Sequence, residues 1–413
     1  MTFQVANKTA IRCRKDLAFY SYTAVFFILA IGIFIQLTGC EQFQQVLTPL
    51  PETDDDAPIK IGVIYSSPTR SHALNGAELA ALKVNGAGGV HGQEIAIVAR
   101  GNISDAEHAG AIAEELITRE RVSAIVGPNL SSYAVPIGEI AQQHGIPMVT
   151  TTATNPSVTA AGDFVFMAAF TDDFQGKVMA QFAIQDLEAK TAAVFTRSGS
   201  LYSEGLSQTF VDNFTAFGGN VLYAQFYMRG DTDFTAQLTE IAESSPDVFF
   251  LPGFSAEIPL VVDQSRALGI TGILLGGDSW DNAALIADNA ELLEGSFFST
   301  FFSANAAAGD LSEEGHQFFT AYAAIFGKAP DGGAALGYDA LRIVVQAMRR
   351  ADELTPTAIR DQIAATENYS GATLLSAYDE NRHANKSAVI DRIVNGEAQF
   401  HKLIEPERQG ELE

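Results

Sequence analysis

Two short turns rich in hydroxyl side chains offer hydrogen-bond donors to a small anion. The turns, residues 127–132 and 150–156, each follow a short apolar run, and a helix-like segment, residues 132–143, lies between them. This order is typical of a βαβ unit, in which both turns leave the carboxyl ends of parallel strands and share one edge of the sheet. The hydroxyls of Ser131 and Thr154, together with the N–H groups that begin the helix, would suit a carboxylate.

The same two hydroxyls also have a purely structural explanation. Serine and threonine are common in turns and as helix N-caps, where they bond to the neighbouring backbone. On the local pattern alone this explanation is preferred for Ser131 and Thr154, so a binding role depends on the rest of the chain.

Short apolar runs alternate with helix-like segments along most of the chain. The strand-like runs are residues 59–64, 94–99, 122–126, 147–149, 192–195, 220–226, 247–251, 272–275 and 295–300. The helix-like segments are residues 73–84, 105–118, 132–143, 173–187, 204–217, 234–242, 256–268 and 310–326. Such alternation predicts doubly wound, parallel sheets. Asp105 is expected to cap its helix, because apolar residues at helical spacing follow it.

Eight short motifs occur in a fixed order along the chain. They are NGAELA at residues 75–80, NGAGGV at 85–90, VGP at 126–128, GIP at 145–147, ATNP at 153–156, GDTDF at 230–234, GGDSWD at 276–281 and LGYDA at 336–340. Each motif is weak by itself. In this order and spacing they resemble the periplasmic leucine/isoleucine/valine-binding protein family, the type I solute-binding proteins of ABC importers, from about residue 59 to residue 400.

The resemblance implies an α/β fold of two Rossmann-like lobes with parallel-rich sheets, joined by three hinge crossings (the type I periplasmic binding protein fold). The crossings would fall near residues 169–173, 299–303 and 378–386. Lobe one would hold residues 59–170 and 301–379, lobe two residues 171–300 and 386–400, and residues 401–413 would form a C-terminal tail.

The resemblance also implies roles for residues around a cleft between the lobes. An amino acid needs donors for its carboxylate and acceptors for its ammonium. By the resemblance, Ser131 and Thr154 would donate hydroxyls to the carboxylate, and the backbone carbonyl of Thr152 would face the ammonium. Asp278, which follows a strand of lobe two, would pair with that ammonium.

Two aromatic residues complete the implied site. Tyr202 matches a cleft tyrosine whose hydroxyl adds to the pairing of the ammonium, and Phe254 matches a wall position often filled by tyrosine. Because Phe254 lacks the hydroxyl, that contact would be lost. The structural alternatives are that Asp278 caps a helix over residues 281–287 and that Tyr202 covers the lobe surface. Trp280 is expected to pack rather than to contact a ligand.

The loop after the first strand departs from the family pattern. Residues 65–73 look shorter than the Gly-containing loop usual there, and they carry Arg70 and His72. A basic residue facing the pocket would select an acidic or polar side chain, or a ligand that is not an amino acid. The alternative is that Arg70 is solvated at the rim. Side-chain specificity is therefore not carried over from the family.

The first 40 residues have the features of an export segment. A basic start precedes a mostly apolar run, residues 17–35, and the sequence LTGC follows at residues 37–40. This tetrapeptide resembles the bacterial lipoprotein signal, which implies lipidation of Cys40; the alternative is an uncleaved transmembrane anchor. Residues 41–58 are polar, contain three prolines and indicate a flexible linker. Either way, the rest of the chain is expected to be periplasmic or at the cell surface, tethered to the membrane.

Composition argues against several other classes of function. A net charge of −25 repels phosphate backbones, so nucleic-acid binding is not expected. The two cysteines, Cys13 and Cys40, lie outside the globular part, and no two of the seven histidines have metal-ligand spacing, so no metal site is expected. Residues 253–257 lack the last glycine of a G-x-S-x-G motif, and the sequence has no P-loop. We therefore expect neither an enzyme nor a cofactor.

These observations predict a monomeric, lipid-anchored solute-binding protein. It would capture an amino acid or a similar small polar solute between its lobes and present it to an ABC permease. Two alternatives stay open. One is an envelope lipoprotein of the same fold that acts as a protein-interaction scaffold or activator of penicillin-binding proteins, and the other is a sensory ligand-binding protein.

Overall fold

The computed structural model describes residues 57–66, 72–306 and 311–406. The expected export segment with Cys40, almost all of the linker, and Arg70 lie outside these residues. Within the described part of the chain, no helix is long and apolar enough to cross a membrane.

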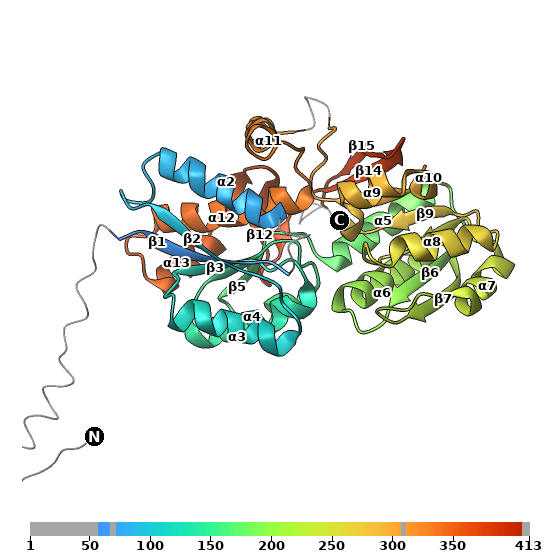
Figure 1. Cartoon of the computed structure of the whole chain (residues 1–413), viewed down its shortest axis with the longest axis horizontal. Helices are drawn as coiled ribbons and strands as arrows, with labels where there is room; N and C mark the ends of the chain where they lie inside the picture. Colours follow the sequence, from blue (N-terminus) through green and yellow to red (C-terminus); the bar gives the residue numbers. More distant parts are fainter. Residues whose placement is uncertain (1–56, 67–71, 307–310, 407–413) are drawn as a thin grey trace, which may run out of the picture. The chain divides into compact units, whose positions relative to one another are not determined.

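The first sheet consists of five parallel strands in the order β2-β1-β3-β4-β5. Its strands are β1 (Ile59–Ile64), β2 (Ile95–Arg100), β3 (Ala124–Val126), β4 (Met148–Thr150) and β5 (Val165–Met167). The helices packed on it include α2 (His72–Gly86), α3 (Ala106–Thr118), α4 (Ser131–His144) and α12 (Gly332–Arg350), with the 3-10 turn η3 (Pro156–Ala161) before β5. Helices α2 and α12 lie on one face, and α3 and α4 lie on the other (Figure 1).

The central strands of this sheet are buried on both faces. In β3, Ala124 and Val126 pack toward α2 and α12, whereas Ile125 packs toward α3 and α4. Successive side chains of a strand point to opposite faces. A continuous apolar run such as residues 122–126 is therefore what a parallel strand covered by helices on both sides requires.

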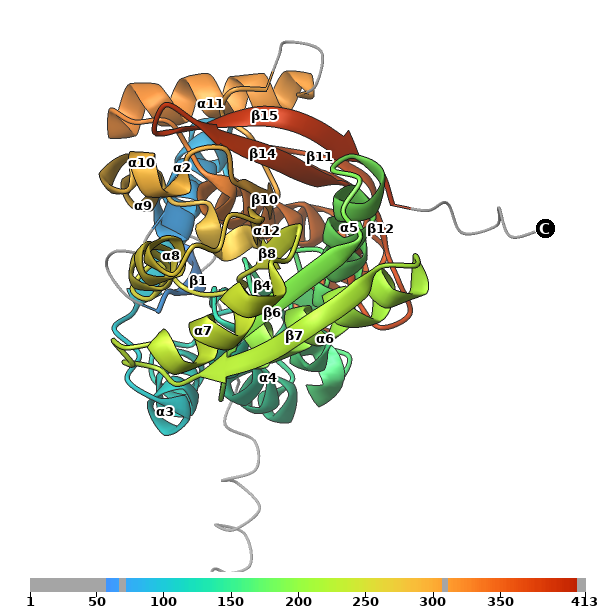
Figure 2. The ribbon, with the colours of Figure 1, turned by 90° about the vertical axis from the view of Figure 1, so that its right-hand side faces the viewer.

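The second sheet has seven strands in the order β15-β14-β10-β9-β8-β6-β7. The parallel strands are β6 (Thr191–Arg197), β7 (Asn220–Tyr227), β8 (Val248–Phe250), β9 (Ile273–Gly276) and β10 (Phe297–Thr300). β14 (Ala388–Val394) pairs antiparallel with β10 and with β15 (Glu397–Ile404), which forms one edge of the sheet, opposite β7 (Figure 2). The helical segments are α5 (Asp172–Gln185), α6 (Leu201–Ala216), α7 (Thr235–Ser244), α8 (Ile258–Ala267), η4 (Asp278–Trp280), α9 (Ala283–Asp288) and α10 (Ala290–Leu293).

The remaining elements lie between β10 and β14 in the sequence. They are α11 (Glu313–Phe326), α12, α13 (Pro356–Ala364) and a small antiparallel sheet of β11 (Glu367–Ser370), β12 (Leu374–Tyr378) and β13 (Ala384–Asn385). In contrast to the expected tail from residue 401, β15 continues to Ile404, because Ile404 still pairs with Ala388 of β14.

Every strand and helix expected up to residue 326 is present, with ends shifted by a few residues. The cap of α3 is confirmed, because Oδ1 of Asp105 accepts a hydrogen bond from the backbone N of His108 at 2.9 Å. α6 begins earlier than expected, because Ser200 caps it through the backbone N of Ser203 at 3.2 Å. Trp280 packs as expected and is fully buried.

Two glycines permit a close crossing of α2 and α12. A Cβ atom on Gly76 would lie 2.0 Å from the carbonyl oxygen of Ala334, and one on Gly337 would lie 2.0 Å from that of Ala73. A side chain cannot be placed at such a distance without moving backbone. The motifs NGAELA and LGYDA are therefore explained, at these positions, by helix packing.

Replacing Gly337 by alanine is expected to lower the free energy of unfolding by about 1–3 kcal/mol, because the added methyl group forces the two helices apart. Urea unfolding followed by circular dichroism measures the change. Gly86→Ala is the matched control, since nothing lies within 4 Å of a Cβ added there; alanine should leave stability equal or raise it by up to about 1 kcal/mol. Parent-like stability of Gly337→Ala would show that the crossing does not depend on this glycine.

Candidate functional site

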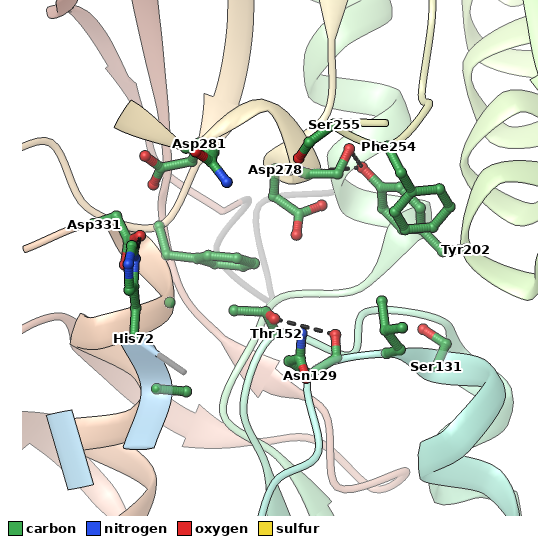
Figure 3. Close-up of a pocket in the computed structure, with 16 residues that line it drawn as sticks. His72, Asn129, Ser131, Thr152, Tyr202, Phe254, Ser255, Asp278, Asp281 and Asp331 are labelled. Carbon is green, nitrogen blue, oxygen red and sulfur yellow. Dashed lines mark hydrogen bonds and ion pairs between the residues drawn. The ribbon is translucent and has the colours of Figure 1, made fainter. Parts of the chain in front are cut away.

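A small cavity lies where turns of the first sheet meet turns of the second (Figure 3). Its volume is about 90 Å³, below the roughly 300–1,000 Å³ of sites for drug-sized ligands. The turns after β3 and β4 and the starts of α2 and α12 line one side. The turns after β8 and β9 and the start of α6 line the other. Because polar side chains reach the cavity from both sides, it suits a small polar solute.

Most of the predicted site residues line this cavity. They are Ser131, Thr152, Tyr202, Phe254 and Asp278. Thr154 is not among the lining residues, because its side chain is fully buried, with the hydroxyl beside the carboxyl group of Asp172. Burial raises the pKa of Asp172 well above its ordinary value, and the Thr154 hydroxyl counters part of that rise. The structure therefore places Thr154 in the interior beside Asp172, and a contact of its hydroxyl with a ligand carboxylate stays a prediction.

Helix α4 begins at the cavity without a side-chain cap. The residue at the cap position is Leu130, and Ser131 is the first residue of the helix, so the N-cap explanation of Ser131 is wrong. The first N–H groups of a helix lack intrahelical partners and carry partial positive charge, which suits an anion. The Ser131 hydroxyl accepts a hydrogen bond from the backbone N of Asn155 at 3.2 Å, which leaves its proton for an acceptor in the cavity.

The two hydroxyl-rich turns are tied to each other. Thr152 donates its hydroxyl to the carbonyl of Asn129 at 3.1 Å, and the hydroxyl of Thr151 donates to that of Pro128 at 3.2 Å. Oδ1 of Asn129 in turn accepts hydrogen bonds from the backbone N and the hydroxyl of Ser66, at 3.0 and 2.6 Å. These contacts join the ends of β1, β3 and β4 into one wall of the cavity.

Asp278 supplies a carboxylate on the opposite wall, across the cavity from Thr152 and Asn129 (Figure 3). It begins η4 directly after β9, and Nε2 of Gln175 donates to its Oδ1 at 2.9 Å. The alternative that Asp278 caps the following helix is wrong. Asn282 caps α9 instead, as its Oδ1 accepts from a backbone N of the first turn at 3.0 Å.

Tyr202 and Phe254 form an aromatic part of the same wall. The Tyr202 hydroxyl donates to Oγ of Ser279 at 3.1 Å, and Ser279 donates to the carbonyl of Gly253 at 2.5 Å. Burial, and next the charge of Asp278, raises the pKa of Tyr202 well above its ordinary value. The ring of Phe254 lies 5.6 Å from that of Tyr202, measured between centroids. The Tyr202 hydroxyl is thus used within the wall, and its contribution to an ammonium site stays a prediction.

His72 lies at the far end of the cavity between two charged neighbours. Its Nδ1 hydrogen-bonds to Oδ2 of Asp331, and its Nε2 lies 2.8 Å from Nζ of Lys328. Because an ammonium group only donates, Nε2 accepts and Nδ1 carries the ring proton. Oδ1 of Asp331 caps α12 by accepting from the backbone N of Ala334 at 2.8 Å. Its position in the loop suggested that His72 could offer a basic group to the cavity. Both of its ring nitrogens are instead engaged by Asp331 and Lys328.

Asp281 is a cavity residue that the sequence analysis did not single out. Its Oδ2 accepts hydrogen bonds from the hydroxyl of Thr300 at 2.5 Å and from the backbone N of Gly332 at 2.7 Å. Burial, and next the charge of Asp331, raises the pKa of Asp281 well above its ordinary value. The sequence feature that could have identified Asp281 is the motif GGDSWD, of which it is the last residue. We call Asp281, Asp331 and His72 together the acid-rich end of the cavity.

The carboxylates around the cavity do not form a metal site. No group of three or more His, Cys, Asp or Glu residues in the described ranges is arranged to hold a metal ion. Asp278, Asp281 and Asp331 line the same cavity but are engaged by different donors, namely Gln175 for the first and backbone N–H groups of α12 for the other two.

Residues 58–397 match the model of the periplasmic binding protein family. This match covers most of the chain, and the chain belongs to that family. The α/β fold with parallel-rich sheets, predicted from the motifs as the type I periplasmic binding protein fold, is confirmed by the structural neighbours described next.

Several relatives have names that describe their ligands. The Leu/Ile/Val-binding protein homolog 3 of Brucella melitensis is 29% identical over 249 residues, which are 59% of this chain and 67% of that protein. A leucine-binding protein from Thermotoga maritima superposes with a TM-score of 0.79 at 35% identity, over 84% of this chain and 99% of that one. The branched-chain amino acid transporter substrate-binding protein of Streptococcus pneumoniae, solved with isoleucine, has a TM-score of 0.78 at 29% identity, over 84% and 100%.

Proposed function

We propose that the chain captures an amino acid in this cavity and presents it to an ABC permease. The observation that carries the proposal is an uncapped helix start and a carboxylate on opposite walls of one small cavity. The start of α4, with Ser131, suits the α-carboxylate of the ligand, and Asp278 suits its α-ammonium. The names of the relatives, which refer to leucine, isoleucine and valine, support the same class of ligand.

The division of the site between two sheets supports capture by closure of two lobes. Ser131 and Thr152 come from turns of the first sheet, whereas Tyr202 and Asp278 come from the second. A ligand that contacts both halves stabilises the state in which they are together. We assign lobe one to residues 59–170 and 301–379 and lobe two to residues 171–300 and 386–404, the latter extended by the pairing of β15.

We also propose that the chain is exported and held at the membrane by a lipid on Cys40. The sequence LTGC at residues 37–40 supports this proposal, and so does membership of a family of periplasmic proteins. Mass spectrometry of the mature N-terminal peptide tests it, and an unmodified Cys40 would contradict it.

A thermal-shift screen tests the binding function. The purified chain, freed of bound ligand by unfolding and refolding, is heated with each of the amino acids and with small carboxylates. A ligand at 100 times its dissociation constant stabilises the folded state by about 2.7 kcal/mol, so the midpoint should rise by several degrees. No shift across the panel, for a folded and ligand-free protein, would overturn amino-acid capture and favour the protein-interaction scaffold.

A further inference from the structure

The acid-rich end of the cavity limits which amino acids the proposed site can bind. We propose that it binds a side chain that ends in a neutral hydrogen-bonding group, such as an amide or a hydroxyl, rather than a branched aliphatic side chain. This inference rests on the proposed function, because it assumes that Ser131 and Asp278 hold the α-carboxylate and the α-ammonium. The names of the relatives described above refer to leucine, isoleucine and valine, whereas the lining of this cavity favours a polar side chain.

The lining of the cavity is poor in aliphatic side chains. Among its described lining residues, Leu130 is the one aliphatic side chain larger than alanine. The other apolar contacts come from Ala73 and from the rings of Tyr202, Phe254 and Phe301. A branched aliphatic ligand is bound by removing its apolar surface from water, and the acid-rich end offers carboxyl groups where such a ligand needs methyl groups.

Asp281 leaves one carboxyl oxygen available at this end. Both of its hydrogen bonds, from Thr300 at 2.5 Å and from Gly332 at 2.7 Å, are made to Oδ2. Its Oδ1 makes no hydrogen bond to any residue in the described ranges, and Asp281 lines the cavity. An apolar ligand packed here would shield that oxygen from water without replacing its hydrogen bonds, which is unfavourable. An amide or hydroxyl on the ligand would satisfy it, because each can donate to an ionised carboxyl group and accept from a protonated one.

The other two residues of the acid-rich end, His72 and Asp331, do not offer a binding partner to an acidic ligand. Both ring nitrogens of His72 are engaged, one by Asp331 and the other by Lys328 at 2.8 Å. Asp331 is engaged through both of its oxygens, by His72 and by the backbone N of Ala334. Oδ1 of Asp281 therefore sets the preference at this end, for a ligand group that can hydrogen-bond to a carboxyl group, and a ligand carboxylate would lie beside the carboxyl groups of Asp281 and Asp331.

Binding of amino-acid pairs of equal size tests the inference by isothermal titration calorimetry on the parent chain. Asparagine and leucine form one pair, and threonine and valine the other. Sites built to hydrogen-bond a polar group discriminate strongly against the analogue that lacks it. We expect asparagine or threonine to bind at least 10-fold more tightly than its aliphatic partner.

The variant Asp281→Ala tests the residue responsible. It removes both carboxyl oxygens, so Asp281 can no longer bond to the ligand as a donor or as an acceptor. The ratio of asparagine to leucine affinity should fall several-fold, since the polar side chain loses its partner at this end. Asp288→Ala is the control, because Asp288 is exposed at the end of α9 and the same change there should leave the ratio unaltered.

Different outcomes separate this inference from the proposed function. Tighter binding of leucine or valine by the parent chain would overturn the inference and leave amino-acid capture standing, and so would tightest binding of aspartate or glutamate. Binding of no amino acid by the folded, ligand-free chain would overturn both. An unchanged affinity ratio in folded Asp281→Ala would overturn the assignment to Asp281. The comparison on the parent chain holds even if that variant does not fold.

Discussion

Replacing Asp278 by alanine is expected to weaken amino-acid binding by about 2–5 kcal/mol, the range for truncating one partner of a buried charge pair. This corresponds to a loss of affinity of about 30-fold to a few thousand-fold. Asp278 lies on the cavity wall opposite Thr152 and Asn129 and is oriented by Gln175 at 2.9 Å. Without this carboxylate, the ligand ammonium would lose the charged partner that we propose for it. Calorimetry with the ligand identified by the thermal-shift screen measures the change.

Two further variants make the result specific. Asp263→Ala removes a carboxylate that is exposed on α8, in the same half of the molecule, and it should bind the ligand as the parent does. Asp278→Asn keeps the size of the side chain and isolates the loss of charge. Parent-like affinity in Asp278→Ala would remove Asp278 from the site and with it the proposed place of the ammonium.

The two walls of the site could be predicted from sequence because their signals are local. Ser131 and Asp278 each follow a short apolar run within a few residues. The ends of parallel strands place such residues at one edge of a sheet. That the two residues face each other across a cleft between the lobes was implied by the family resemblance of the motifs. Thr154 shows the limit of this reasoning, since position along a turn does not decide whether a side chain points into the cavity or toward Asp172.

The acid-rich end could not be predicted because its contacts join distant segments. His72 and Asp331 are 259 positions apart, and Asp281 is 51 positions from Gly332, to which it is bound. No local pattern of residues records such a contact. The contact of His72 with Asp331 follows from the crossing of α2 and α12, which brings the starts of both helices to the cavity, whereas Asp281 reaches Gly332 from the turn after β9.

After residue 326 the sequence contains only weak patterns from which its helices and strands could be predicted. α12 opens with Gly332 and Gly333, which are poor helix formers, and its start is fixed by the cap at Asp331 and by packing on α2. In β15 exposed and half-buried positions alternate, so its sequence lacks a clear apolar face. Its place at the sheet edge comes from pairing with β14 rather than from its own composition.

Asp339, in the motif LGYDA, has a structural rather than a ligand-binding position. It is buried in α12, and its oxygens accept hydrogen bonds from the hydroxyl of Tyr369 at 2.8 Å and from the backbone N of Ala372 and Thr373 at 2.8 Å each. The hydroxyl of Thr373 also donates to it, at 2.6 Å. These bonds hold the turn between β11 and β12 against α12. The same Thr373 hydroxyl accepts from Nζ of the buried Lys386 at 2.7 Å.

Asp339 and Lys386 therefore form a buried, oppositely charged pair bridged by Thr373. Burial raises the pKa of Asp339, and the charge of Lys386 opposes that rise. Burial lowers the pKa of Lys386 to about 8, and the charge of Asp339 opposes that fall. Lys386 also donates to the carbonyl of Ala168 at 2.9 Å, which connects the pair to the segment that leaves β5. Each charge is tolerated in the interior because the other is present.

Replacing Asp339 by alanine is consequently expected to lower the free energy of unfolding by about 3–5 kcal/mol, because it leaves Lys386 as an uncompensated buried charge. Urea unfolding measures the loss. The double variant Asp339→Ala, Lys386→Met separates the charge from the lost hydrogen bonds of Tyr369 and Thr373. If the unpaired ammonium dominates, the double variant should be more stable than Asp339→Ala, and the two substitutions should be non-additive by more than about 1 kcal/mol. Additive losses would show that the hydrogen bonds, not the charge pair, hold this turn to α12.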